Sequence, residues 1–158
     1  MMRKGIALVA ALTVICAAGS AWALGLGVGY RLPTGNMADL YDGGWGANFV
    51  LEFPVTPLAT VYGDVGYTRF MSKSGTALGL AGLSDIDVWG FSAGAKTGLA
   101  GAGGLYLGGE VGYFTEIAEL GISPLLGFGL GPLDLSARWK FTGDARWFDF
   151  RAAISLGP

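Results

Sequence analysis

The chain has 158 residues, of which 52% are hydrophobic, 14% are charged and 29 are glycine, whereas an average soluble domain carries about 25% charged residues and about 7% glycine. We expect one domain, and this domain lacks the charge to coat an ordinary water-facing surface. The missing Gly-X-Y period excludes collagen, the aromatic content of 13% argues against a disordered chain, and 10 basic against 12 acidic side chains leave no footprint for nucleic acid.

The N-terminal segment is typical of a secretory signal peptide. Arg3 and Lys4 precede an apolar run over residues 6–18, and Ala21-Trp22-Ala23 supplies small residues where a signal peptidase cuts. The run is too short to span a bilayer as a helix. We therefore expect a signal peptide over residues 1–23 and a single domain over residues 24–158. The lone Cys16 lies in the removed part, so no disulfide or thiol chemistry is expected after it.

From Leu24 onward the sequence alternates at period two, which indicates strands. Residues 24–32 alternate large apolar side chains with glycine and arginine, and the same alternation recurs seven more times. The sixth repeat is the weakest because Pro124 lies near its start. The predicted connections between these eight strands are residues 33–43, 54–57, 71–85, 100–104, 115–120, 131–132 and 142–145.

The strand pattern leaves two folds to compare. A soluble lipocalin-like or sandwich domain would bury the apolar face, but its water-facing surface would then be mostly glycine and serine. The two long connections are both odd-numbered and the even-numbered ones are all short, as in outer-membrane barrels. Strands of about 9 to 11 residues suit a tilted membrane crossing, and a sheet survives in hydrocarbon only when closed. We predict an all-β, eight-stranded antiparallel up-and-down transmembrane β-barrel.

Outward-facing aromatic residues support this orientation. With the chain running up and down, seven of the eight strands place one near the external end, as expected for a belt at the membrane interface. The predicted belt consists of Tyr30, Trp45, Tyr67, Trp89, Tyr113, Trp139 and Phe148.

The inward face carries five basic and five acidic residues, which predicts mutual neutralisation inside a barrel only wide enough for side chains. This lumen charge network comprises Arg31, Lys96, Arg138, Lys140 and Arg151 with Glu52, Asp64, Glu110, Asp134 and Asp149. An unpaired ion there would cost several kcal/mol, about as much as the effective desolvation of one charge. A water-filled pore is therefore not expected.

A last turn at residues 143–144 sets the register of the final hairpin. It places Arg138 opposite Asp149, Ser136 opposite Arg151 and Lys140 opposite Trp147. By the same reasoning Lys96 faces Gly108, with Glu110 one diagonal step away. Adjacent strands offer no obvious base to Glu52, Asp64 or Glu110.

Candidate chemistry is sparse. The chain has no histidine, which removes Ser-His and Asp-His catalysis. Paired inward carboxylates could perform acid–base chemistry, but a structural ion network is the better interpretation. Asp39, Asp42, Asp85 and Asp87 at the external rim lack calcium-loop spacing and are expected to be solvated loop charges. We expect no catalytic residues, metal site or cofactor.

The chain from Leu24 resembles the small eight-stranded outer-membrane barrels of Gram-negative bacteria, the OmpA-like and OmpX-like superfamily. The likeness is carried by Gly-Leu-Gly-Val-Gly-Tyr at 25–30, by Pro54-Val-Thr-Pro57 and by the alternating strand 148–156. The resemblance implies a bacterial outer-membrane location, with membrane lipid and lipopolysaccharide as partners.

Three function classes follow. The first is a structural or surface-interaction barrel that contacts a partner through loops 33–43 and 71–85. The second is a narrow conduit or binding protein for a small hydrophobic or amphipathic ligand, in the manner of OmpW-like barrels. The third, a lipid-modifying barrel enzyme, is disfavoured by the missing histidine. The apolar loop 71–85 is expected to fold over the barrel mouth or to contact lipid or a partner.

Overall fold

The computed structural model describes residues 22–73, 84–101, 104–117 and 119–156. The predicted signal peptide lies almost wholly outside these residues, and so does most of the predicted loop 71–85. No helix in the described segments is long and apolar enough to cross a membrane.

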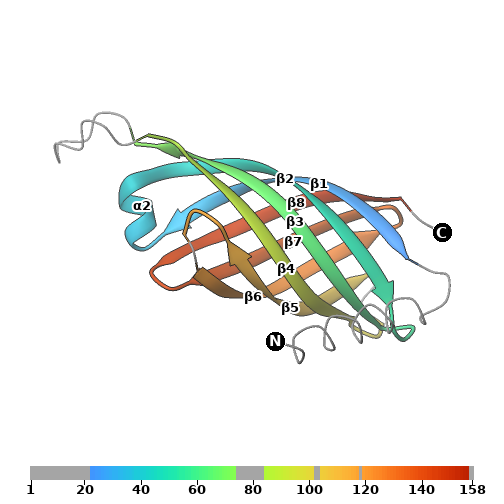
Figure 1. Cartoon of the computed structure of the whole chain (residues 1–158). Helices are drawn as coiled ribbons and strands as arrows, with labels where there is room; N and C mark the ends of the chain where they lie inside the picture. The colour runs from blue at the N-terminus through green and yellow to red at the C-terminus, as the bar shows by residue number, and fades with distance from the viewer. Residues whose placement is uncertain (1–21, 74–83, 102–103, 118, 157–158) are drawn as a thin grey trace, which may run out of the picture.

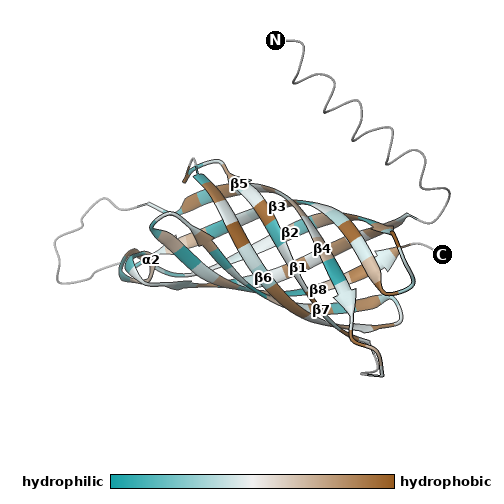
Figure 2. Ribbon diagram, turned by 90° about the horizontal axis from the view of Figure 1, so that it is seen from below, coloured by the Kyte–Doolittle hydropathy of each residue, from teal (hydrophilic) through white to brown (hydrophobic). Residues whose placement is uncertain are grey.

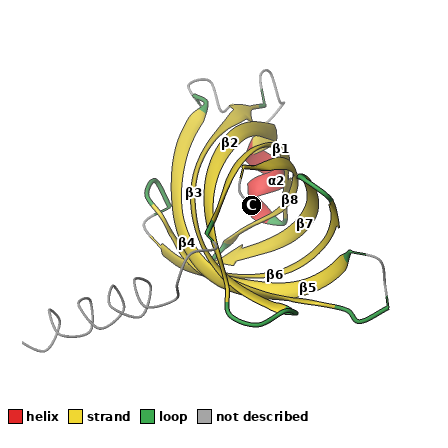
Figure 3. Cartoon of the chain, turned by 90° about the vertical axis from the view of Figure 1, so that its right-hand side faces the viewer, coloured by secondary structure: helices red, strands yellow, loops and turns green. Residues whose placement is uncertain are grey.

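The described chain forms one closed antiparallel barrel in which each strand pairs with its sequence neighbours and the last pairs with the first (Figure 1). The prediction of an eight-stranded antiparallel barrel is confirmed. Figure 3 looks along the barrel, with the short helix α2 visible at the far end. The elements are β1 (Ala23–Thr34), α2 (Asn36–Leu40), β2 (Tyr41–Pro54), β3 (Ala59–Ser72), β4 (Ile86–Gly98), β5 (Leu105–Phe114), β6 (Glu119–Leu130), β7 (Leu133–Thr142) and β8 (Ala145–Leu156).

The barrel has two different ends. The loop end carries α2 and the connections that follow β1, β3, β5 and β7, while the turn end carries the connections that follow β2, β4 and β6. In Figure 1 the loop end lies at the left, where α2 is labelled, and the turn end lies at the right.

Side chains alternate across the barrel wall along every strand, as the period-two pattern predicts. Large apolar residues such as Val28, Trp45 and Ile122 remain 60% or more exposed on the outside, and Figure 2 shows brown and teal alternating along the ribbons. The predicted register of the last hairpin is confirmed, with Arg138 opposite Asp149. An exterior this apolar suits hydrocarbon and not water.

The first predicted connection, 33–43, is wrong in extent. β1 continues to Thr34, because residues 31–34 pair with β8, and β2 already begins at Tyr41. Only 35–40 connect the two strands, and most of them form α2. Gly35 has a φ of 59°, a left-handed conformation that glycine adopts at little cost, and it turns the chain into the helix.

The start of the sixth strand is also corrected. β6 begins at Glu119 within the predicted connection 115–120, and Pro124 lies inside the strand with its ring outward. The pairing of β6 with β7 is interrupted between Ile122 and Leu125, because the two residues between them have no partner on β7. Proline has no N–H to give to the ladder, so the interruption falls where the proline stands.

Two apolar clusters fill the bore above and below its polar middle. At the loop end, Trp147 lies 5.8 Å from Phe70 and 5.2 Å from Phe114 between ring centroids. Met37 of α2 and Val88 complete this cluster. Toward the turn end the buried cluster consists of Val50, Tyr62, Tyr106 and Leu125.

Inward glycines leave the room that long charged side chains need. At Gly46 a Cβ atom would lie 2.6 Å from Nη1 of Arg31 and would also meet the backbone oxygen of Tyr67. The outward Gly63 is different, because its nearest neighbour, the backbone oxygen of Ser92, would be 4.0 Å away.

This contrast gives a matched pair of substitutions. We expect Gly46→Ala to destabilise the folded barrel by about 1–3 kcal/mol, the usual cost of overpacking. Gly63→Ala should leave stability unchanged or raise it by up to about 1 kcal/mol. Urea unfolding in lipid vesicles, followed by tryptophan fluorescence, measures both, and equal losses for the two variants would contradict the assigned faces.

Candidate functional site

All ten residues of the predicted lumen charge network face the barrel interior. Seven of them are buried, each with less than 8% of its surface exposed: Arg31, Asp64, Glu110, Arg138, Lys140, Asp149 and Arg151. The remaining three, Glu52, Lys96 and Asp134, are partly exposed toward the turn end. Successive side chains of a strand point to opposite faces of the sheet, and each of these ten residues occupies an inward position in that alternation.

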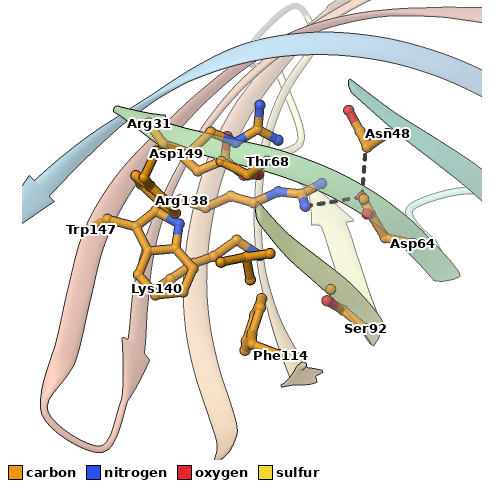
Figure 4. Close-up of a pocket in the computed structure, with 14 residues that line it drawn as sticks. Arg31, Asn48, Asp64, Thr68, Ser92, Phe114, Arg138, Lys140, Trp147 and Asp149 are labelled. Carbon is orange, nitrogen blue, oxygen red and sulfur yellow. Dashed lines mark hydrogen bonds and ion pairs between the residues drawn. The ribbon is translucent and has the colours of Figure 1, made fainter. Parts of the chain in front are cut away.

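Asp64 is one of two carboxylates on which the network converges. Its Oδ2 accepts hydrogen bonds from Nη1 of Arg138 at 3.1 Å, from Nη1 of Arg151 at 2.8 Å and from Nδ2 of Asn48 at 3.0 Å. Asp64 lies on β3 and the two arginines lie on β7 and β8, so these bonds cross the bore. Figure 4 shows the bonds of Asp64 to Arg138 and to Asn48.

Glu110 is the second such carboxylate. It accepts hydrogen bonds from the ammonium of Lys140 and from the hydroxyl of Tyr62, the latter at 3.0 Å. Arg138 also lies 3.1 Å from its Oε2. Because Nη1 of Arg138 contacts both Asp64 and Glu110, one guanidinium joins the two halves of the network.

Further ion pairs extend the network in both directions. Toward the loop end, Nε of Arg31 lies 3.0 Å from Oδ1 of Asp149. Toward the turn end, Nζ of Lys96 lies 2.7 Å from Glu52 and 3.7 Å from Asp134.

Asp134 ties that lower group to the middle of the bore. Its Oδ1 lies 3.5 Å from Nη2 of Arg151, and its Oδ2 accepts a hydrogen bond of 2.6 Å from the hydroxyl of Tyr106. Each of the ten charged residues therefore has at least one partner of opposite sign.

The structure supplies partners that the sequence did not reveal. Arg138 and Asp149 are opposite each other, but the ion pair of Asp149 is with Arg31, its neighbour across the seam where β1 meets β8. Lys96 does face Gly108, yet it pairs with Glu52 and not with Glu110. Working out the β1–β8 register would have found the first of these pairs.

Three neutral residues of the site were not singled out in the sequence. Asn48, Tyr62 and Tyr106 all hydrogen bond to carboxylates of the network. Bulky polar side chains at inward positions of a glycine-rich face were the available signal.

Little free volume remains inside this network. A cavity of about 20 Å³ lies among Arg31, Asp64, Arg138, Asp149 and Trp147 (Figure 4). That is room for about one water molecule. In the described segments no group of three or more acidic, cysteine or histidine side chains is placed to hold a metal ion.

At the loop end, polar contacts hold α2 and the residues on either side of the β3–β4 connection in place. Lys73 donates from Nζ to the carbonyl of Ala38 at 2.6 Å. Asp85 accepts from the backbone N–H of Ser72 at 3.0 Å and from the guanidinium of Arg69. These donors hold the pKa of Asp85 below its usual value.

The four acidic residues expected to be solvated loop charges are therefore only partly so. Asp85 is bonded as described, Asp87 accepts a hydrogen bond from Tyr67 at 2.7 Å, and Asp42 lies 4.0 Å from Lys73. Asp39 is exposed in α2. The contacts of Asp42, Asp85 and Asp87 could not be predicted from the sequence, because their partners come from other parts of the chain.

The seven residues of the predicted aromatic belt all occupy outward positions. Six of them stand in three cross-strand pairs, with ring centroids 4.9 Å apart for Tyr30 and Trp45, 5.3 Å for Tyr67 and Trp89, and 5.3 Å for Trp139 and Phe148. Tyr113 is 43% exposed.

The sequence matches no protein-family model and no curated protein. Solved structures do match. Neisserial surface protein A (NspA) is 13% identical, with a TM-score of 0.57 over 87% of this chain and 97% of that one. Ail, the attachment invasion locus protein of Yersinia pestis, is 12% identical, with a TM-score of 0.55 over 86% and 98%. A de novo designed transmembrane β-barrel is 12% identical, with a TM-score of 0.51 over 85% and 95%.

The chain has the fold of the small eight-stranded outer-membrane barrels. The likeness covers almost the whole length of NspA and Ail, so this chain is a barrel of their size. At this identity the likeness speaks for the fold alone, and the residues in the bore and at the loop end are this chain's own.

Removing one central carboxylate tests the energetics of the site. We expect Asp64→Asn to destabilise the barrel by about 3–5 kcal/mol, because two buried arginines lose a shared partner. Glu52→Gln at the partly exposed end of the network should cost no more than about 1 kcal/mol. Urea unfolding in vesicles gives both values. A loss below about 1 kcal/mol for Asp64→Asn would show that the central ion pairs contribute little.

Proposed function

We propose that this chain is an integral protein of the bacterial outer membrane, with a lumen plugged by its charge network and a structural or surface-interaction role at its loop end. The observation that carries the proposal is the filled middle of the bore, where the cavity among Arg31, Asp64, Arg138 and Asp149 holds only about 20 Å³. If nothing passes through the centre of the barrel, the function does not depend on transport. The surface that remains for contact with partners is then the loop end.

The membrane part of the proposal rests on the exterior. Apolar side chains cover the outside of the strands, and the β1–β8 pairing leaves no open edge. Hydrocarbon tolerates a sheet only in this closed form, since no water is present to satisfy a free edge. The aromatic belt near the loop end fits one membrane interface.

Catalysis is not part of the proposed function. A general acid or base needs a carboxylate free to exchange a proton with substrate, and Asp64 and Glu110 are each bonded to several donors in a space without room for substrate.

The alternative is a narrow conduit or binding protein for a small hydrophobic or amphipathic ligand, as in OmpW-like barrels. A conduit needs a continuous path. Here the path meets Met37, Phe70 and Trp147 at the loop end and the ion network below them. We therefore rank this alternative second.

Conductance separates the two functions. We expect purified folded barrel in planar lipid bilayers to show no single-channel steps, because the network fills the bore. Folding is checked by the different gel mobility of boiled and unboiled samples, and a known porin serves as the positive control. Reproducible steps from folded protein, or uptake of an amphipathic dye into vesicles, would favour the conduit.

The loop end also constrains the kind of partner. Outside the bore it carries seven acidic residues and only three basic ones. These are Asp39, Asp42, Asp85, Asp87, Glu116, Glu119 and Asp144 against Arg69, Lys73 and Arg146. Such a surface favours a neutral or cationic partner and repels polyanions. One structure of Ail holds the heparin analogue sucrose octasulfate, and we propose that this chain does not share that ligand class.

We expect the barrel in nanodiscs of neutral lipid to bind polylysine and not heparin, with affinity that falls as salt rises. The matched control replaces Glu116, Glu119 and Asp144 by their amides and should weaken polylysine binding. Fluorescence anisotropy of labelled polymers measures both. Heparin binding by the unmodified barrel would contradict the assigned surface.

A further inference from the structure

The connections at the turn end of the barrel carry no charged side chain, and the three charged residues nearest to them, Glu52, Lys96 and Asp134, face the bore. All twenty charged residues from Leu24 onward lie in the described part of the chain, ten in the bore and ten at the loop end. The connections at the turn end, 55–58, 99–104 and 131–132, contain only apolar residues, glycine, proline and one threonine. Outside the bore, all the charged side chains from Leu24 onward thus lie at the loop end.

The large exposed side chains of the turn-end connections and of the strand ends beside them are apolar. Val55 is 63% exposed, Leu58 55%, Leu130 52% and Leu156 55%. Soluble surfaces seldom expose so many large apolar residues together without a covering surface. Something other than bulk water is needed to cover this end.

The backbone of the β2–β3 turn is hydrogen bonded within the turn. Val55 and Thr56 donate to the carbonyl of Ala59 at 2.8 and 3.1 Å, and the hydroxyl of Thr56 accepts from the N–H groups of Leu58 and Ala59. Prolines at 54, 57 and 132 have no N–H to satisfy. Internal pairing of this kind is the condition for backbone to leave water and enter lipid.

Two of the connections also accept hydrogen bonds from neighbouring strands. Gly98 donates to the carbonyl of Leu58 at 2.7 Å, and Ser155 donates to the carbonyl of Pro132 at 2.7 Å. The turns are therefore fastened to neighbouring strands and do not project singly.

No charged residue separates this end from the lipid-facing wall in the described part of the chain. At the loop end, outward Tyr67 and Trp89 are followed along the strands by charged Arg69 and Asp87, which marks where the wall meets water. At the turn end, the outward positions run from Phe53 on β2 and Leu130 on β6 into the turns without a charge. The apolar wall continues around the rim.

From these observations we propose that the turn end lies within the lipid interface of the inner leaflet, with its connections immersed among lipid and not projecting into water. The partner of this surface is the membrane itself. Lipid fits this surface because an apolar surface without charge needs no oppositely charged partner and few hydrogen bonds. Lipid also already covers the outer face of the strands next to it. The proposal rests on the proposed membrane insertion, and it further specifies how deep the turn end lies in the membrane.

Single cysteines test the depth, because the chain from Leu24 has none of its own. We would place an environment-sensitive NBD label at Val55→Cys, Leu99→Cys and Leu130→Cys in barrels refolded into phosphatidylcholine vesicles. The expected result is blue-shifted emission, quenching by nitroxide lipids and loss of quenching by aqueous iodide. Asp144→Cys at the loop end is the water-exposed control.

Leu26→Cys, outward on β1 and 53% exposed, separates failure of this proposal from failure of membrane insertion. A watery signal at Leu26→Cys overturns insertion itself. A lipid signal at Leu26→Cys together with watery signals at all three turns overturns the immersed turn end alone.

Discussion

Closure of the backbone ladder in a narrow ring is the constraint on which the rest of the structure depends. Eight strands pair around the full circle, from β1–β2 to β8–β1, so every strand edge is used. A ring of this size leaves an interior only as wide as its side chains. Any charge that alternation points inward must then meet a partner from another wall, because the space for hydrating water is missing. The crossing bonds of Arg138 and Arg151 to Asp64 are the consequence, and so are inward glycines such as Gly46.

The ion network need not be what makes the barrel stable. Buried ion pairs lose much of their attraction to desolvation, and a well-packed apolar interior of the same volume often does as well. What the network adds is geometry. Nη1 of Arg138 contacts carboxylates from β3 and β5 at once, and Asp64 accepts from β2, β7 and β8. Walls that are distant along the chain are held at set separations, and this opposes the deformation that opening a pore through the centre would require.

Much of the wall could be predicted from the sequence, because it depends on local alternation. Which residues face inward and which outward follows from a period of two, and the last hairpin follows from its two-residue turn. What could not be predicted depends on closure or on the packing of side chains from separate elements. Asp64 and Arg151 are 87 residues apart and belong to non-adjacent strands, so no pairwise register brings them together. Met37 lies in a short helix without a side-chain cap, held by Phe70, Trp147 and Phe114, and its neighbours exist only once the barrel has formed.

The weak sequence identity to NspA, Ail and a designed barrel follows from the same physics. The wall asks only for apolar side chains outside, small or mutually neutralised ones inside, and turns that close the ladder, and many sequences meet these terms. Because many barrels share such a wall, it indicates little about function. Functional differences between barrels are therefore expected at the two ends of the barrel. In this chain those two ends differ: the loop end carries all the charged side chains that lie outside the bore, and the connections at the turn end carry none. A barrel built in this way has one end suited to water and a partner, and one end suited to the membrane.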